Sequence, residues 1–477
     1  MPLIIPGNRQ ASTGFTINQS IRFNDDDSPI LKKTYSSAGT EETFTLSMWV
    51  KRGNIGAGLG ASNLGLTLFS GGASVSDYGE IVFRSSGYGV QDSLHFYNSA
   101  SGSINFELVT TQLFRDPSAW YHLVFVMDTT NAVASERMRI YVNGSRVTDF
   151  STETYPSKDA VPNFNTATEH GIGGFAVSTD TRFFDGYLAE IVFLDGTATD
   201  CNSFAEFNSS GIWVPKSVSG LTFGTNGFHI DGRDSADLGD DESGQGNDYT
   251  ASGLASHDQM VGESPTNNFA VLSPINIYGS NVALAEGNLQ SSVSSSSNNR
   301  GAKATQGATS GKWYFEVYFS SSSSDNNGGV GVSGNSEYNG VPGETSDSEG
   351  FRYMDAGNFR QNGSSSSVIT TISAGDVVMV AFDIDNNKAW FGKNGTFFSS
   401  GDPANGNNPL TTTVPDLALP ASYHYSTPAT QIFNFGQEGT FAGNITAGGN
   451  SDGNGIGNFK YSVPSGYLAI CTKNLGS

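Results

Sequence analysis

Two stretches of this chain, far apart from each other, share one pattern of residues. The first is WYHLVFVMD (120–128), followed after a loop by RMRIYVNGSRV (137–147). The second is GDVVMVAFDID (375–385), followed by KAWFGKNGTFF (388–398). Each predicts a buried strand, a polar connection and a second strand ending in an Asn-Gly turn, because Asn and Gly accept the positive φ angles of tight hairpins. The repetition favours two β-sandwiches in tandem, an arrangement commoner in surface-binding proteins than in metabolic enzymes.

The composition favours an all-β chain. The 477 residues include 59 glycines, and the apolar runs are short and bounded by Gly, Asn, Asp or Ser. No window of about 12 residues has a clean 3.6-residue apolar period, so helices are not expected. The length is sufficient for two or three domains. We therefore expect two tandem antiparallel β-sandwiches.

Charge and cysteine content narrow the classes of partner. The chain has 24 basic and 46 acidic residues, a net charge of −22 that would repel a phosphate backbone, so nucleic acid is not an expected partner.

Cys201 and Cys471 form no disulfide framework or metal pattern, and we expect both to be free and buried in a protein made in a reducing cytosol. The N-terminus does not have the pattern of a signal peptide, and VVMVAF (377–382) is too short to span a bilayer, so membrane insertion is not expected.

The segment from residue 15 to residue 215 carries three motifs in order. FTLSMWVKRG (44–53) comes first, the hairpin at 120–147 follows, and FFDGYLAEIVFLDG (183–196) comes last. This order resembles the laminin-G-like, concanavalin-type jelly roll. That family has a Trp-containing strand, a strand leading to a Y-V-N-G hairpin, and a closing G-x-hydrophobic-x-E strand. The resemblance implies a β-sandwich over residues 15–215.

The last part of the chain, residues 267–477, carries a different set of motifs. These are GKWYFEVYF (311–319), GGVGVSG (328–334), the hairpin at 375–398 and IFNFGQ (432–437). Together they resemble a SPRY-type sandwich, in which the first motif is an inner strand and the F-N-F-G strand ends the core. The resemblance implies that loops at one rim form the binding surface.

Residues 216–266 differ from both flanking segments and are expected to form an acidic, loop-rich connector. GFHIDGRDSADLGDDESGQGND (227–248) contains seven acidic residues and no apolar periodicity. Calcium prefers six to eight oxygen ligands, and six aspartates are candidates for such a site, although their spacing is not that of an EF-hand. The candidates are Asp231, Asp234, Asp237, Asp240, Asp241 and Asp248. The alternative is a solvated acidic loop that binds no metal.

Three features of the sequence are candidates for catalysis, and none meets the chemical requirement of the reaction that it suggests. A glucanase strand carries carboxylates on alternate residues, but the position two after Glu190 is Val192. The string GNSDG (449–453) matches a hydrolase elbow, yet it lies in a Gly/Asn-rich loop without a following helix. His122 sits within a strand and fits a structural role better than a catalytic one. We therefore expect no catalytic residues and no enzymatic activity.

Aromatic residues outside the apolar runs are the best candidates for ligand contact. Sugar rings stack on aromatic side chains while loop amides and carboxylates bond the hydroxyls. Five aromatic residues fall in loop-like stretches rich in Gly, Asn, Ser or Asp, and they form the expected binding set. They are Tyr78, Tyr88, Tyr338, Tyr353 and Phe359.

Taken together, the two sandwiches and their connector resemble structural proteins of tailed bacteriophages, especially of marine hosts. PTNNFAVLSP (265–274) contributes to this resemblance, since it is similar to a linker between sandwich domains in phage tail proteins. The resemblance implies a virion protein, a tail fibre or a decoration, that is synthesised in the host cytoplasm and binds a host-surface glycan or protein through rim loops. The alternatives are a purely structural capsid-decoration or tail-adaptor protein, a polysaccharide-degrading tail enzyme, and a cellular SPRY protein that binds peptides.

The resemblance to phage structural proteins also predicts how such a protein would assemble. An N-terminal arm at residues 1–14, which contains prolines at positions 2 and 6, could dock on other virion proteins. Weak binding by single modules would be strengthened by multivalency, by roughly 10² to 10⁴. A homo-oligomer is therefore expected, and a trimer is one arrangement, although no coiled-coil heptad specifies it.

Overall fold

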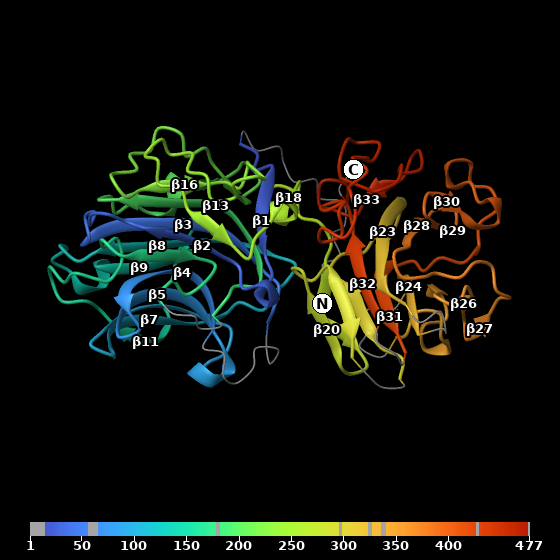
Figure 1. Ribbon diagram of the computed structural model, residues 1–477, viewed down its shortest axis with the longest axis horizontal. Helices are drawn as coiled ribbons and strands as arrows, with labels where there is room; N and C mark the ends of the chain where they lie inside the picture. Colours follow the sequence, from blue (N-terminus) through green and yellow to red (C-terminus); the bar gives the residue numbers. More distant parts are fainter. Residues whose placement is uncertain are drawn as a thin grey trace. The chain divides into compact units, whose positions relative to one another are not determined.

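Figure 1 shows the computed structural model, which describes residues 15–55, 65–177, 182–294, 298–322, 327–334, 340–425 and 429–475. The expected arm at 1–14 lies outside these residues. Strands and short 3-10 turns make up all the regular structure in the described residues, so the expected all-β fold class is confirmed. Within the same ranges, no helix is long and apolar enough to cross a membrane.

The chain forms two compact units, which we call the first and second sandwich. Among the described residues, the first consists of residues 15–260 with 264–266, and the second of residues 261–263 and 267–475. Residues 216–260, expected as part of a connector, thus belong to the first unit and contribute short strands to it. The expected boundaries at 215 and 266 stay predictions.

Two eight-stranded sheets build the first sandwich. One has the order β10-β9-β8-β3-β13-β1-β18, with β16 also paired to β13, and the other has the order β11-β7-β6-β5-β4-β12-β2-β17. The first sheet contains β1 (Gln19–Phe23), β3 (Thr43–Arg52), β8 (Trp120–Asp128), β9 (Met138–Val142), β10 (Ser145–Arg146), β13 (Gly186–Asp195), β16 (Phe228–Ile230) and β18 (Gln259–Val261). The second contains β2 (Ile30–Thr34), β4 (Gly65–Ser74), β5 (Asp77–Arg84), β6 (Ser93–Ala100), β7 (Ser103–Leu113), β11 (Phe150–Thr154), β12 (Glu169–Ile172) and β17 (Thr250–Ser252).

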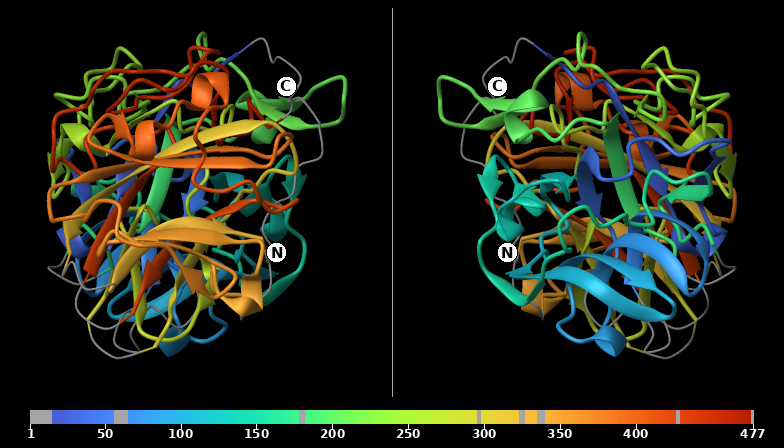
Figure 2. Two further views of the ribbon diagram at one scale, coloured as in Figure 1. Left: turned by 90° about the vertical axis from the view of Figure 1, so that its right-hand side faces the viewer. Right: turned by 90° about the vertical axis from the view of Figure 1, so that its left-hand side faces the viewer.

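The second sandwich also has two main sheets, seen as two layers in the left view of Figure 2. The orders are β19-β22-β31-β24-β25-β26-β27 and β20-β21-β32-β23-β28-β29-β30, with β33 (Leu468–Ala469) parallel to β23. The first of these contains β19 (Leu272–Tyr278), β22 (Gly301–Ala304), β24 (Gly328–Ser333), β25 (Phe351–Met354), β26 (Phe359–Gln361), β27 (Ser364–Ser365) and β31 (Leu419–His424). The other contains β20 (Val282–Ala285), β21 (Gln290–Val293), β23 (Lys312–Ser321), β28 (Val377–Asp383), β29 (Lys388–Lys393), β30 (Thr396–Phe397) and β32 (Ala429–Asn434).

Both hairpins expected from the repeated pattern are present. β8 pairs with β9, and β28 pairs with β29, each in antiparallel register. The turn after β9 has φ angles of 47° at Asn143 and 83° at Gly144, and the turn after β29 has 51° at Asn394 and 88° at Gly395. These positive angles are those that a tight hairpin turn of this kind requires. The two predicted turns are therefore confirmed.

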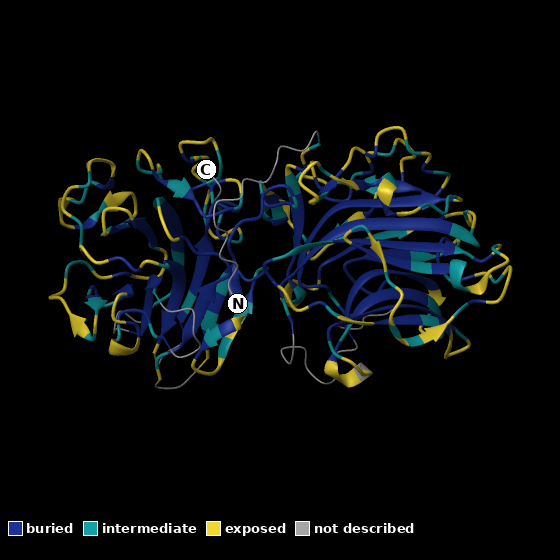
Figure 3. Ribbon diagram, turned by 180° about the vertical axis from the view of Figure 1, so that it is seen from behind, coloured by how far each residue is buried: buried dark blue, intermediate teal, exposed yellow. Residues whose placement is uncertain are grey.

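The central strands of the first sandwich are buried on both faces. Every residue of β13 is buried, and so is every residue of β3 after its first. One face packs in the core between the two sheets, while Val124, Val126, Val192 and Leu194 point to the opposite side. Residues 201–223 cover that side with Phe204, Val218 and Phe223, which pack against these strands. Figure 3 shows buried residues following the strands and exposed ones following the loops.

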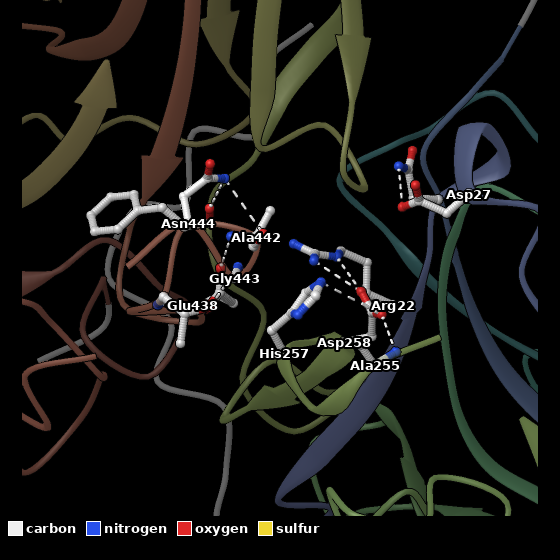
Figure 4. Close-up of polar contacts among 12 residues, drawn as sticks. Arg22, Asp27, Ala255, His257, Asp258, Glu438, Ala442, Gly443 and Asn444 are labelled. Carbon is white, nitrogen blue, oxygen red and sulfur yellow. Dashed lines mark hydrogen bonds and ion pairs between the residues drawn. The ribbon is translucent and has the colours of Figure 1, made fainter. Parts of the chain in front are cut away.

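A buried ion pair holds the end of the acidic segment on β1. The Arg22 guanidinium donates to Asp258 Oδ1 from Nε at 3.1 Å and from the terminal nitrogen NH2 at 2.9 Å. The second carboxylate oxygen of Asp258 accepts from the backbone N–H of Ala255 (Figure 4). Both side chains are buried, so the ion pair lies in the interior, where each charge requires a partner.

Two glutamates organise the loops that close the second sandwich. Glu438 accepts from the backbone N–H groups of Thr440 and Ala442, and the turn they define places Phe441 in a buried apolar cluster (Figure 4). Glu316, on β23, accepts from the backbone N–H groups of Lys460 and Tyr461, each at 2.8 Å. Segments without regular structure are thus attached through carboxylates that satisfy backbone donors.

The cover over the first sandwich can be tested with a matched pair of phenylalanines. Phe204 is buried against the sheet, whereas Phe207, three residues later on β14 (Ala205–Phe207), is 58% exposed. We expect Phe204→Ala to cost about 3–5 kcal/mol of unfolding free energy, because it leaves a cavity over β8 and β13. Phe207→Ala should cost about 1 kcal/mol or less. Calorimetry of the first sandwich's transition measures both, and equal effects would show that the cover does not stabilise the sheet.

Candidate functional site

The aromatic residues predicted to bind ligand do not lie together. Tyr353 is fully buried in β25, where it stacks on Phe398 and its hydroxyl donates to the Thr370 carbonyl, and Phe359 is buried in β26. The structure therefore places these two in the core and not in a rim loop. Tyr338 lies outside the described residues, and so does the side chain of Tyr88. Tyr78, on β5, is half-buried.

Five of the six aspartates of the acidic segment accept hydrogen bonds from backbone N–H groups nearby. Asp231 accepts from the backbone N–H of Arg233, and Asp234 from that of Ala236. Asp241 accepts from the backbone of Ser243 and Asn247 and from that of His229 on β16. The other three candidates, Asp237, Asp240 and Asp248, lie in the same turns. No group of three or more His, Cys, Asp or Glu side chains in the described residues is arranged to hold a metal ion.

Tyr78 belongs to a polar cluster on the outward face of β5, β6 and β7. Glu80 accepts from Arg182 at 2.7 Å, from Thr67 at 2.5 Å and from the Tyr97 hydroxyl. On β7, Glu107 pairs with His95 at 2.9 Å, and this bond lowers the pKa of Glu107. Register places Tyr97 between the two glutamates.

The chemistry of this cluster is not that of a glycosidase. A general acid in such an enzyme needs a raised pKa and access to the substrate. Glu107 has a lowered pKa, and Glu80 is buried with both carboxylate oxygens bonded to neighbours. The cluster therefore stabilises the sheet.

Ser47 and His122 lie at the distance of a hydrolase Ser–His pair, but the imidazole proton is on the wrong nitrogen for catalysis. His122 Nε2 lies 2.9 Å from the Ser47 hydroxyl, while Nδ1 accepts from the indole N–H of Trp213 at 3.1 Å. Because Nδ1 is the acceptor, the neutral ring carries its proton on Nε2 and cannot take one from the serine. Both side chains are also buried, so the expected structural role of His122 agrees with its contacts.

The second sandwich has an open groove on the outer face of its seven-stranded sheet, with a volume of about 550 Å³. Phe351 and Tyr353 of β25 point inward against Phe391, so the alternate residues, Arg352 and Met354, point outward. The residues that line the groove come from β25, β26, β27, β31 and adjacent loops. They are Asn299, Glu344, Arg352, Met354, Asn358, Arg360, Ser365, Tyr423 and Tyr425.

Two glycines make room for this groove. Gly329 and Gly331 of β24 pair with Met354 and Arg352 on one side and with Tyr423 and Ala421 on the other. A β-carbon at Gly331 would lie 2.8 Å from the Arg352 β-carbon, and one at Gly329 would lie 3.3 Å from the Tyr423 ring. At these two positions the middle strand therefore presents no side chain, and the Arg352 guanidinium extends until its carbon lies 3.9 Å from the centre of the Tyr423 ring.

One carboxylate organises the charged wall of the groove. Glu344 accepts from Arg352 at 2.6 Å and from Arg360 at 2.8 Å through each of two nitrogens. Burial alone would raise the pKa of Glu344, but the hydrogen bonds from the two arginines outweigh it and lower the pKa. The remaining terminal nitrogen of Arg360 donates to Ser365 at 3.0 Å.

The opposite wall is aromatic and carries neutral polar groups. Tyr425 is 41% exposed, and the hydroxyl of the buried Tyr423 donates to the Asn299 side chain at 2.8 Å. An exposed aromatic beside amide, hydroxyl and guanidinium groups is suited to bind a sugar ring and its hydroxyls. This set of groups offers an aromatic surface and hydrogen-bond donors and acceptors to a ligand.

The three predicted aromatic residues whose side chains the structure describes, Tyr78, Tyr353 and Phe359, do not line this groove, although one signal in the sequence pointed to it. GGVGVSG (328–334) places two glycines on the same face of a strand, and such a strand leaves the face open. The aromatic contribution from Tyr423 and Tyr425 was hidden because ASYHYS reads as an ordinary alternating strand.

Comparisons with known proteins agree with this architecture. Residues 24–201 match a family model described as the Concanavalin A-like lectin/glucanases superfamily, so the first sandwich contains a laminin-G/concanavalin A-like domain. The match spans less than half of the chain, and no curated protein matches it.

Similar solved structures include three from animals. The SPRY domain of human HERC1 is 20% identical, with a TM-score of 0.28, covering 34% of this chain and 96% of that one. A heptameric SAP-like pentraxin from Limulus polyphemus is 16% identical (TM-score 0.28, 38% and 78% covered). Domains LG4-5 of the mouse laminin alpha1 chain are 10% identical (TM-score 0.29, 90% and 85% covered).

Buried histidines predict that the two sandwiches respond differently to acid. Burial lowers the pKa of His122 to about 3 and that of His170 to about 4, both in the first sandwich. In the second, burial and Arg300 lower the pKa of His424 to about 3, whereas burial raises that of Glu316 to about 7. Below pH 6.5 an unfolded histidine takes up a proton that the native one does not, so stability falls as the pH falls. The native Glu316 takes up a proton earlier than the unfolded one, which has the opposite effect.

Two more histidines of the first sandwich act in opposite directions: burial lowers the pKa of His95, whereas at His229 burial is outweighed by the hydrogen bond to Glu190, which raises the pKa. From His122 and His170 we therefore expect the first sandwich to lose up to about 2.7 kcal/mol of unfolding free energy per pH unit between pH 6.5 and 5. The second should change far less, because His424 and Glu316 offset each other. Calorimetry at pH 7.5, 6 and 5 measures both transitions. An equal slope for both sandwiches would contradict the assignment of charge states.

Proposed function

We propose that this protein is a non-enzymatic binding protein that attaches to a surface glycan through the groove on its second sandwich. The observation that carries the proposal is the groove itself, which is lined by the exposed Tyr425 and by Arg352 and Arg360. Its open shape and polar lining suit a saccharide that enters from solvent. The laminin-G/concanavalin A-like domain of the first sandwich supports a binding role, because the matched family includes lectins.

The matched family also includes glucanases, and three features support a role without catalysis. Of the outward glutamates of the first sandwich, Glu107 has a lowered pKa, and Glu80 is buried and not accessible to a substrate. Glu316, whose pKa is raised to about 7, is fully buried and bonds two backbone N–H groups. The Ser47–His122 pair has its proton on the wrong nitrogen.

The proposal places this activity on a bacteriophage particle, as a tail fibre or decoration that contacts the host. Support for this setting comes from the resemblance of the two sandwiches and their connector to phage structural proteins. On a particle, many copies would raise the avidity of a weak single site by roughly 10² to 10⁴. A purely structural decoration or adaptor protein is the alternative outcome.

A glycan and bacterial-polysaccharide array, probed with the purified chain, tests the proposed function. We expect selective retention of one glycan class, and about a three- to tenfold lower affinity for Tyr425→Ala, because the variant lacks the stacking surface. Phe207→Ala removes a more exposed aromatic from the first sandwich and should bind as the parent does. Uniform absence of binding by a folded chain would favour the structural alternative, and release of reducing ends would favour an enzyme.

A further inference from the structure

The charged wall of the groove contains more positive than negative charge. Arg352 and Arg360 lie directly opposite each other on the paired strands β25 and β26. Like charges in that position repel, and Glu344 offsets the repulsion by accepting hydrogen bonds from both. One carboxylate cannot neutralise two guanidinium groups, and Glu344 is the one acidic residue among those that line the groove. A unit of positive charge is therefore left uncompensated.

Two further basic residues lie at β22 in the same sheet. The Arg300 guanidinium is buried beside the groove and donates to the Tyr425 carbonyl at 3.0 Å. Lys303 pairs with Ala421 in the row of residues that continues through Gly331 to Arg352 and Arg360. A nearby acid, Asp347, is buried and accepts from Ser333 and the backbone N–H of Gly334. A positive groove on a chain of net charge −22 is a local reversal of the overall field.

The side chain best placed to meet an anion is Arg360. It is 27% exposed, whereas Arg352 is 2% exposed and packs on the Tyr423 ring. A guanidinium presents its donors in a plane that matches carboxylate and sulfate oxygens. An anion bound at Arg360 would neutralise the positive charge that Glu344 leaves uncompensated.

The other lining groups favour a saccharide over an acidic peptide. Tyr425 offers an exposed aromatic surface, and Asn299, Asn358 and Ser365 surround the groove with amides and a hydroxyl. Peptide sites typically add apolar pockets for anchoring side chains. Here the one aliphatic lining residue, Met354, is 5% exposed and offers no such pocket.

We infer that the groove binds an acidic saccharide, whose carboxylate or sulfate group contacts Arg360 while a sugar ring stacks on Tyr425. This inference rests on the proposed function, because it names the class of glycan that the same site takes. Affinity should fall as salt is added, since the contact with Arg360 is partly exposed and therefore screened.

Calorimetric titration of the full chain tests the inference with matched pairs of probes. Oligogalacturonate is compared with the same oligomer after its carboxyl groups are reduced to alcohols, and dextran sulfate with dextran. We expect about tenfold or greater preference for at least one acidic member, and which pair shows it distinguishes carboxylate from sulfate recognition. Raising NaCl from about 50 to about 300 mM should weaken only the acidic member.

Two variants then locate the contact. Arg360→Gln should lose the preference for the acidic member, whereas Lys158→Gln, which removes one exposed positive charge from the first sandwich, should keep it. Equal binding of acidic and neutral members, or a preference insensitive to salt, would overturn the inference while leaving the proposed function intact. Absence of binding to any member of the glycan array overturns both. Binding of an oligoglutamate peptide as tight as that of the acidic saccharide would overturn the assignment to sugars.

Discussion

Burial of apolar side chains on both faces of a sheet is the constraint on which the first sandwich depends. Strands β3, β8 and β13 carry apolar residues toward the opposite sheet and also away from it. A face that carries Val124, Val126, Val192 and Leu194 is stable only when another segment removes it from water. Residues 201–223 do this, and the buried pair of Arg22 with Asp258 attaches the later part of the same region to β1. The acidic segment is therefore part of the first sandwich and not a separate interdomain linker.

The second sandwich shows what happens where a sheet face is not covered in this way. On β24, Gly329 and Gly331 replace side chains with space, so the outer face is a groove. Its walls carry the groups that a covered face would exclude: an exposed tyrosine and two arginines that share one glutamate. The binding function that we propose follows from this contrast. A loop segment covers the apolar outer face of the first sandwich, whereas the polar outer face of the second is open to solvent.

Much of the fold could be predicted from local patterns. The two Asn-Gly turns and the strands before them depend on residues close in sequence, and the structure confirms both hairpins. The candidate site was harder to predict. Tyr353 and Phe359 lie in stretches rich in Gly and Asn, yet tertiary packing places them in the core. Local composition could not distinguish them from Tyr425, because the difference depends on which strands pair with β25 and β31.

The sequence by itself determined the all-β class, the two sandwiches and the buried free cysteines, because alternation, turn residues and cysteine spacing act over short distances. Only the tertiary structure decided which polar groups meet. Glu344 joins Arg352 and Arg360 because β25 and β26 are paired and the loop before them returns to the same face. Asn299 reaches Tyr423 across more than a hundred residues of chain. Such contacts depend on long-range register, which no local pattern of residues encodes.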